Sequence, residues 1–257
     1  MRILLTNDDG INAEGLTALE RIAAELSSDV WICAPETERS GASRALTLAE
    51  PLRVRQLDSR RFSTTGTPTD CVMLGVRELV EGKAPDLVLS GVNRGANLAE
   101  DVTMSGTVAG AIEAMAMGVP GIALSQGGFY EGAKGYESAE HFAPGIIRRL
   151  VQVGWPADVV MNINFPSRPL AEITEVEVTR QGFRDAHVRM VEKRTDLRGR
   201  DYYWVGYRQE RSQPAPGTDL RALYDGKISV TPLHIDLTHG ESVHKLSGVL
   251  GGAPPRA

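Results

Sequence analysis

Cysteine, aromatic residues and long apolar segments are all scarce in this chain of 257 residues. The only two cysteines, Cys33 and Cys71, are too far apart in sequence to form the closely spaced pair of a metal-binding motif. We interpret them as buried, reduced thiols. No apolar run approaches transmembrane length, and the first residues lack the features of a secretory signal. The sequence therefore predicts a cytoplasmic protein that makes no contact with a membrane.

The chain also has no excess of positive charge. Its formal net charge is −5, from 28 basic and 33 acidic residues. This balance gives no basis for general binding to nucleic acid. Low-complexity segments and internal repeats are absent from the sequence, and its length suits one large α/β domain or two small ones.

The first half of the chain alternates between strand and helix patterns. Strands are predicted at 2–6, 30–34, 87–90, 122–125 and 159–164, and helices at 13–28, 69–80, 106–117 and 140–151. Such alternation predicts parallel strands joined by right-handed helical crossovers. The strands lack polar alternation, as expected when both faces are buried. We predict an α/β fold with a Rossmann-like, doubly wound, mostly parallel sheet within residues 1–166.

Beyond residue 166 the pattern changes. Alternating, extended segments occur at 176–179, 202–207 and 228–231, and the stretch 182–218 is charged, arginine-rich and aromatic. This stretch does not continue the strand–helix alternation. We predict a single domain in which residues 167–250 contain a protruding β-arm that contacts other subunits, followed by a frayed tail at 251–257.

Three of the predicted strands run directly into polar loops. The first ends at Asp8 and Asp9, the second continues to Ser40, and a later strand continues to Asn93. Ligands of open α/β sheets bind at the carboxyl ends of the strands. Because neighbouring strands lie only about 5 Å apart, these loops can share one site.

The adjacent carboxylates Asp8 and Asp9 repel each other unless a positive charge compensates them. One reading is that a divalent cation does so; another is that one aspartate caps the next helix while the other is solvated. The Ser40 hydroxyl and the Asn93 amide carbonyl complete an all-oxygen set that suits Mg²⁺ or Mn²⁺. These loops contain no histidine or cysteine, which argues against zinc. We predict a divalent-metal site whose two aspartates are also catalytic.

A second polar segment predicts phosphate binding. Asn97 supplies a donor, and Ser105, Gly106 and Thr107 open a helix whose N-terminus is a natural seat for phosphate. The alternative is that Ser105 simply caps this helix. The segment is neither a Walker A loop nor a dinucleotide fingerprint. Asp70 is interpreted as a helix-start residue rather than as a catalyst.

Taken together and in order, these segments resemble the SurE (survival protein E) family of nucleotidases. The segments that carry the resemblance are Thr6-Asn-Asp-Asp-Gly10, Ala34-Pro-Glu-Thr-Glu-Arg-Ser40-Gly41, Gly66-Thr-Pro-Thr-Asp-Cys71, Ser90-Gly-Val-Asn-Arg-Gly-Ala-Asn97, Ser105-Gly-Thr107, Asn162-Ile-Asn-Phe-Pro166, Val178-Thr-Arg-Gln-Gly182 and Ile228-Ser-Val-Thr-Pro-Leu-His234. They extend over nearly the whole chain.

The resemblance implies a 5′/3′-nucleotidase that hydrolyses nucleoside monophosphates and also short-chain polyphosphate. It implies one Mg²⁺ or Mn²⁺ ion per subunit, held by Asp8, Asp9, Ser40 and Asn93, and a homodimer or homotetramer that exchanges its β-arm. In one place the chain departs from the family, because Arg44 stands where histidine is usual. Phosphate handling or base preference can therefore differ in this protein.

The mechanism that these residues suggest is in-line attack on the phosphate by a metal-activated water, with Asp8 or Asp9 accepting the proton. An aspartyl-phosphate on Asp8 is an alternative. A haloacid-dehalogenase-like phosphotransferase would require Asp-x-Asp instead of Asp-Asp-Gly. A nucleotide-binding regulatory module without turnover is the remaining hypothesis, and it would not need two adjacent carboxylates.

Overall fold

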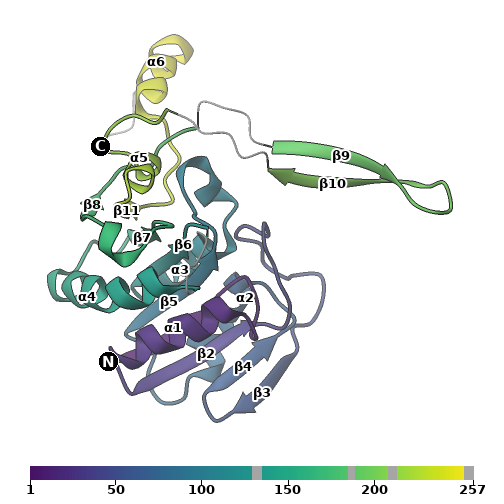
Figure 1. The fold of residues 1–257 in the computed structure, drawn as a ribbon, viewed down its shortest axis with the longest axis vertical. Coiled ribbons are helices and arrows are strands. Elements are labelled where there is room, and N and C mark those ends of the chain that lie inside the picture. The colour runs from purple at the N-terminus through teal and green to yellow at the C-terminus, as the bar shows by residue number, and fades with distance from the viewer. Residues whose placement is uncertain (129–134, 185–188, 208–212, 252–257) are drawn as a thin grey trace.

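The structure, a computed structural model, describes residues 1–128, 135–184, 189–207 and 213–251. Its strands in the main sheet are β1 (Arg2–Thr6), β2 (Asp29–Pro35), β3 (Val54–Asp58), β4 (Arg61–Thr64), β5 (Leu87–Arg94), β6 (Gly121–Gln126), β7 (Val160–Phe165), β8 (Val176–Val178) and β11 (Ile228–Leu233). They form nine neighbouring strands in the order β3-β4-β2-β1-β5-β6-β7-β11-β8 (Figure 1). Only the β3–β4 and β7–β11 pairings are antiparallel within this sheet. The predicted mostly parallel sheet is confirmed.

Helices cover both faces of the sheet. They are α1 (Glu14–Ala24), α2 (Pro68–Leu74), α3 (Gly106–Ala116), α4 (Glu137–Val153), α5 (Asp219–Tyr224) and α6 (Gly240–Leu250), with short turns of other helix types at Gly75–Leu79, Ala99–Thr103 and Leu170–Glu172. Helix α1 lies beside α4, and α2 lies beside α3. Successive residues of a strand face opposite sides, so Ile3 and Leu5 pack in the core with α1 and α4, whereas Leu4 packs in a separate core cluster with α2 residues. The doubly wound arrangement is therefore confirmed.

Two local predictions differ from the structure. In the segment predicted as a helix at 69–80, the α-helix ends at Leu74, and a π-helical turn follows at Gly75–Leu79. Strands β3 and β4 were not predicted: every residue of β3 is exposed, so it has no buried pattern to recognise, and β4 is only 4 residues long. Asp70 has the predicted helix-start role, since it and Thr67 form a reciprocal capping box at the start of α2.

The β-arm is narrower than the predicted segment 167–250. It is the antiparallel hairpin of β9 (Arg189–Thr195) and β10 (Asp201–Tyr207), which projects away from the sheet in Figure 1. Strands β8 and β11 instead extend the main sheet, and β11 pairs with β7 along its whole length. Their short extended patterns gave no sign of which sheet they join. The predicted frayed tail lies almost entirely outside the described residues.

The stem of the arm is fixed to the core by a buried carboxylate. Asp219, at the start of α5, is fully buried. Its side chain accepts hydrogen bonds from the backbone N–H groups of Ala99 and Gly182, each at 2.8 Å. Residues 180 and 218 also form a β-bridge. The chain therefore leaves for the hairpin and returns from it at nearly the same place.

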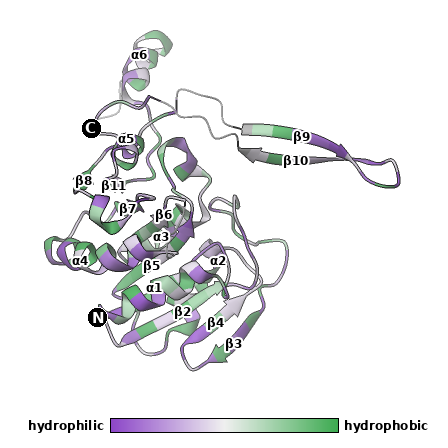
Figure 2. Cartoon of the chain, viewed as in Figure 1, coloured by the Kyte–Doolittle hydropathy of each residue, from purple (hydrophilic) through white to green (hydrophobic). Residues whose placement is uncertain are grey.

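The hairpin carries exposed apolar side chains. Tyr203, Trp204 and Val205 of β10 and Val191 of β9 all face solvent, and Trp204 is 59 % exposed. Figure 2 shows hydrophobic residues on both strands and hydrophilic residues around the tip. Among the described residues, no helix combines the length and apolar character needed to span a bilayer.

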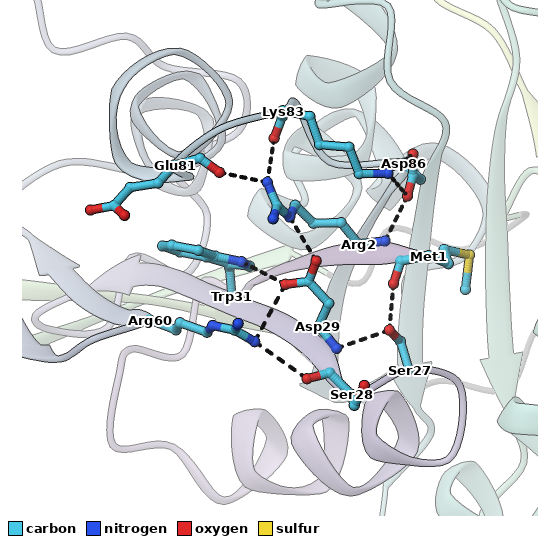
Figure 3. Close-up of polar contacts among 10 residues, drawn as sticks. All are labelled: Met1, Arg2, Ser27, Ser28, Asp29, Trp31, Arg60, Glu81, Lys83 and Asp86. Carbon is cyan, nitrogen blue, oxygen red and sulfur yellow. Dashed lines mark hydrogen bonds and ion pairs between the residues drawn. The ribbon is translucent and has the colours of Figure 1, made fainter.

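A charged cluster around Trp31 lies at the amino-terminal ends of β1 and β2 (Figure 3). Asp29 accepts hydrogen bonds from Trp31 Nε1 at 3.0 Å and from Arg2 Nε at 2.9 Å. The guanidinium carbons of Arg2 and Arg60 lie 5.7 and 5.4 Å from the Trp31 ring centroid, which is cation–π distance. The Arg2 hydrogen bond holds the pKa of the Asp29 carboxyl below its usual range. This cluster joins β1 and β2 to the loop before β4.

We expect Trp31→Phe to lower the free energy of unfolding by about 1–2 kcal/mol, since it removes the hydrogen bond to Asp29 and leaves a small cavity. Urea denaturation followed by circular dichroism measures this change. Val153→Ala, at an 85 % exposed position at the end of α4, is the control and should change stability by less than about 0.5 kcal/mol. Equal urea midpoints for the wild type and Trp31→Phe would contradict the role given to this cluster.

Candidate active site

The three polar loops predicted to share a site do lie together. Strands β2, β1 and β5 are neighbours and run parallel, so their carboxyl ends reach the same edge of the sheet. The backbone N–H of Arg39, beside Ser40, donates to the Asp8 carbonyl oxygen at 2.7 Å. The backbone N–H of Arg94, beside Asn93, lies 3.4 Å from Asp9 Oδ2. Each outer loop is therefore bonded to one of the two aspartates.

Asp8 is nearly buried at the N-terminus of α3. Only 4 % of it is exposed, and its Oδ1 accepts a hydrogen bond of 2.5 Å from the Thr107 hydroxyl. A Cβ at Gly106 would lie 2.7 Å from Asp8 Cβ, so the close approach of α3 requires glycine there. Burial raises the pKa of the Asp8 carboxyl, and the Thr107 hydrogen bond opposes that rise. The positive end of the helix also favours a carboxylate at this point.

Asp9 is less buried than Asp8 but close to it. Burial, followed by the negative charge of Asp8, raises the pKa of Asp9 to about 6. The two neighbouring carboxylates therefore favour the loss of one negative charge or the arrival of a positive one. The repulsion between these carboxylates was predicted from their adjacency in the sequence.

The loop that carries Ser40 lies directly on the loop that carries the aspartates. The backbone N–H of Ile11 donates to the Pro35 carbonyl oxygen at 2.7 Å. Gly10 has a φ of +102° and would place a Cβ 3.3 Å from the Thr37 carbonyl carbon, so a side chain there would be strained. Ser40 is exposed, and its hydroxyl donates to Glu38 Oε1 at 2.8 Å. Glu38 was not singled out in the sequence.

Asn93 is partly buried at the end of β5. Its side-chain nitrogen donates to the carbonyl oxygen of Gly95 at 2.8 Å. That hydrogen bond leaves the amide oxygen as the atom of Asn93 that could bind a cation. Asp8, Asp9, Ser40 and Asn93 together offer the oxygen atoms that could hold a hard divalent ion.

Of the residues predicted to bind phosphate, Gly106 and Thr107 lie against Asp8, and Asn97 and Ser105 have hydrogen-bond partners elsewhere in the protein. Asn97 is 8 % exposed, and its side-chain nitrogen donates to Ser125 Oγ at 2.8 Å. Ser105 caps α3 by accepting a hydrogen bond from the Val108 N–H at 3.1 Å. The capping alternative for Ser105 is thus observed, whereas phosphate contact by Asn97, Ser105, Gly106 and Thr107 stays a prediction.

Arg44, which replaces the usual histidine, is held by α3. Its Nη2 and Nε atoms donate to Glu113 Oε2 at 2.8 and 3.1 Å. The preceding residue, Ser43, donates its hydroxyl to the Thr103 carbonyl oxygen at 2.7 Å. These contacts tie the segment after Ser40 to the segment that leads into α3. The Arg44 guanidinium therefore has an ion-pair partner inside the protein.

Tyr136 is a further side chain near the aspartates that the sequence did not indicate. It is 5 % exposed, and a Cβ at Gly15 would lie 3.0 Å from its hydroxyl oxygen. Burial and the charge of Asp9 raise the pKa of Tyr136 to about 12. Tyr136 precedes α4 and lies far from Asp9 in sequence, so no local pattern could have linked the two.

Comparisons with known proteins find relatives that match most or all of the chain. The model of the family described as "Survival protein SurE" matches residues 3–188. A protein from Phenylobacterium zucineum named "5′-nucleotidase SurE" is 77 % identical over 256 residues, covering 100 % of both chains. A protein of the same name from Caulobacter vibrioides is 72 % identical over 259 residues, covering 100 % of this chain and 98 % of its own.

A solved structure gives the same result for the fold. The crystal structure of the SurE protein from Aquifex aeolicus has a TM-score of 0.82 and 39 % sequence identity. It covers 97 % of this chain and 100 % of its own. With the family model matching most of the chain and relatives matching all of it, this chain belongs to the SurE family.

Proposed function

We propose that this chain is a 5′-nucleotidase that hydrolyses nucleoside 5′- and 3′-monophosphates to nucleoside and phosphate, with the help of one divalent cation per subunit. The observation that carries the proposal is the pair Asp8 and Asp9 at the shared edge of β1, β2 and β5. The relatives named 5′-nucleotidase SurE support the reaction, because they match the chain over its full length. Short-chain polyphosphate is proposed as a further substrate.

The residues of the site fit Mg²⁺ or Mn²⁺. Two carboxylates, a hydroxyl and an amide oxygen form a hard, all-oxygen set. The raised pKa values of Asp8 and Asp9 indicate that negative charge at this edge lacks full compensation. When bound, a divalent cation would neutralise phosphate oxygens and lower the pKa of a coordinated water.

The protein's own residues fix the geometry of the reaction. Thr107 and Gly106 hold Asp8 in place, and the Asp8 burial disfavours its use as a covalent nucleophile. Asp9 is only partly buried and is therefore the better placed of the two to accept a proton from water. We assign the remaining phosphate oxygens to Asn97 and to the N-terminal turn of α3 at Ser105, Gly106 and Thr107.

We also propose that the chain associates with itself through the β9–β10 hairpin, as a homodimer or homotetramer. The support is the set of exposed apolar side chains on both faces of the hairpin, at Tyr203, Trp204 and Val205, on a two-stranded hairpin that has no other strand beside it among the described residues. Exposed patches of this kind on a projecting element are typical of protein interfaces. A cytoplasmic location is part of the same proposal.

Purified protein should hydrolyse AMP when Mg²⁺ or Mn²⁺ is present and lose this activity in excess EDTA. We expect Asp9→Asn to lower kcat/KM by roughly 100-fold, since it removes a charge that holds the cation. Phosphate release measures the activity, and Asp158→Asn, at an exposed position, is the control. AMP binding without any turnover would favour a regulatory module instead, and trapped phosphate on Asp8 would favour the covalent route.

The metal-free protein should become less stable as the pH rises from about 4 to about 6. Asp9 titrates near pH 6 in the folded protein and near 3.8 in its unperturbed state. The stability contributed by its proton is therefore complete below about pH 4 and is lost as the pH rises through about 6. Melting temperatures recorded in EDTA measure the effect. Asp9→Asn should show a smaller loss than the wild type, and an equal loss would contradict this origin.

Replacing Tyr203 and Trp204 together by serine should shift the assembly toward smaller species, because it removes two large exposed aromatic side chains of the hairpin. Light scattering coupled to size-exclusion chromatography measures the mass. Arg198→Ala, in the turn of the same hairpin, is the matched control and should leave the mass unchanged. A Tyr203→Ser/Trp204→Ser variant with the mass of the wild type would exclude this hairpin as the main contact.

A further inference from the structure

Glu38 lies beside the proposed cation site without belonging to the proposed ligand set. Its Oε1 accepts a hydrogen bond of 2.8 Å from the Ser40 hydroxyl. The residue that follows it, Arg39, donates its backbone N–H to the Asp8 carbonyl oxygen at 2.7 Å, so Glu38 lies beside the loop that carries both aspartates. Within the part of the chain that the structure describes, no three acidic, histidine or cysteine side chains converge as a metal cluster. Glu38 is therefore close to the aspartates but does not complete a cluster with them.

The backbone around Glu38 holds this side chain at the site. The Arg39 N–H donates to the Asp8 carbonyl oxygen, and the Ile11 N–H donates to the Pro35 carbonyl oxygen, both at 2.7 Å. A Cβ at Gly10 would lie 3.5 Å from the Glu38 backbone nitrogen. These contacts fasten the loop on both sides of Glu38 to the loop that carries the aspartates. Glu38 and Ser40 are both exposed, but their backbone is fixed.

We propose that Glu38 is a positioning residue for the cation site. Its carboxylate accepts a hydrogen bond from the Ser40 hydroxyl and adds a negative charge beside the loop of Asp8 and Asp9. The inference rests on the proposed function, in which Ser40 is a ligand. A hydroxyl has one hydrogen and two lone pairs. With its hydrogen committed to Glu38, Ser40 turns its lone pairs away from Glu38, where a cation can use them.

The physical reason is common to metal sites. A ligand that is itself hydrogen-bonded to a carboxylate is held in one orientation and becomes a better donor to the metal. Removal of such an outer partner typically weakens metal affinity by about 10- to 100-fold. Glu38 is exposed, so we expect an effect at the lower end of this range.

The neighbouring Glu36 provides a matched comparison. It lies in the same loop and is also exposed, but the Ser40 hydroxyl donates its hydrogen bond to Glu38 and not to Glu36. A change at Glu36 removes the same formal charge from nearly the same place in the sequence. Any difference between Glu36 and Glu38 variants therefore reports the specific contact with Ser40 and its proximity to the aspartates.

The test is the Mn²⁺ affinity of the metal-free, full-length protein, measured by electron paramagnetic resonance of free Mn²⁺. We expect Glu38→Gln to bind Mn²⁺ about 10-fold more weakly than the wild type, because it keeps an accepting oxygen but loses the charge. Glu38→Ala, which also loses the acceptor, should bind more weakly still. Glu36→Gln should bind as the wild type does. Melting temperatures in EDTA check that each variant folds.

A second readout separates positioning of the cation from a general loss of structure. AMP hydrolysis by Glu38→Gln should need more Mn²⁺ for half-maximal rate, whereas kcat at saturating Mn²⁺ should approach that of the wild type. Wild-type Mn²⁺ affinity in both Glu38 variants would overturn the inference and leave the proposed function standing. A wild-type protein that neither binds Mn²⁺ nor requires a divalent cation for turnover would overturn the proposed function and this inference with it.

Discussion

The structure depends on keeping two adjacent carboxylates at the end of one buried strand. Asp8 has almost no access to water, and desolvation disfavours its charge. The surroundings offset that cost: the Thr107 hydroxyl donates to the carboxylate, and the N-terminus of α3 approaches it through Gly106. These groups are fixed before any ligand arrives. The same arrangement determines that α3 begins at Gly106 and explains why this residue is glycine.

The order of strands explains why residues from distant parts of the sequence meet at the aspartates. Strand β1 lies between β2 and β5, so the loops after all three strands open at one edge. At the opposite ends of these strands, Arg2 of β1 joins Asp29 and Trp31 of β2 through a hydrogen bond and a cation–π contact (Figure 3). Oppositely charged side chains therefore pair at the amino-terminal ends of these strands, whereas two carboxylates lie close together at the carboxyl end of β1.

Sequence patterns were sufficient for features that depend on burial. The strands β1, β2, β5, β6 and β7 have buried residues on both faces, so their apolar runs identified them, and their order along the chain indicated a parallel sheet. Placement of Ser40 and Asn93 near the aspartates followed from that topology. Strand β3 was missed because an exposed edge strand has no such pattern.

Other features depend on contacts that no local pattern records. The hydrogen bond from Ser40 to Glu38 depends on how one loop folds upon the next, and the approach of Tyr136 to Asp9 depends on the path of the chain before α4. For Ser105, the sequence left two alternatives open, a helix cap and a phosphate contact. The structure establishes the cap, whereas the other role depends on a ligand.

The stem of the arm has a consequence for how such a protein can diversify. The chain enters and leaves the hairpin through residues 180–182 and 217–219, which are bridged to each other and bonded to the core through Asp219. A hairpin anchored in this way is attached to the core through one fixed pair of segments. Its length and surface can change over evolution while the strands that end at Asp8 and Asn93 keep their places. Changes in the hairpin can therefore accumulate without displacing the strands that end at these residues.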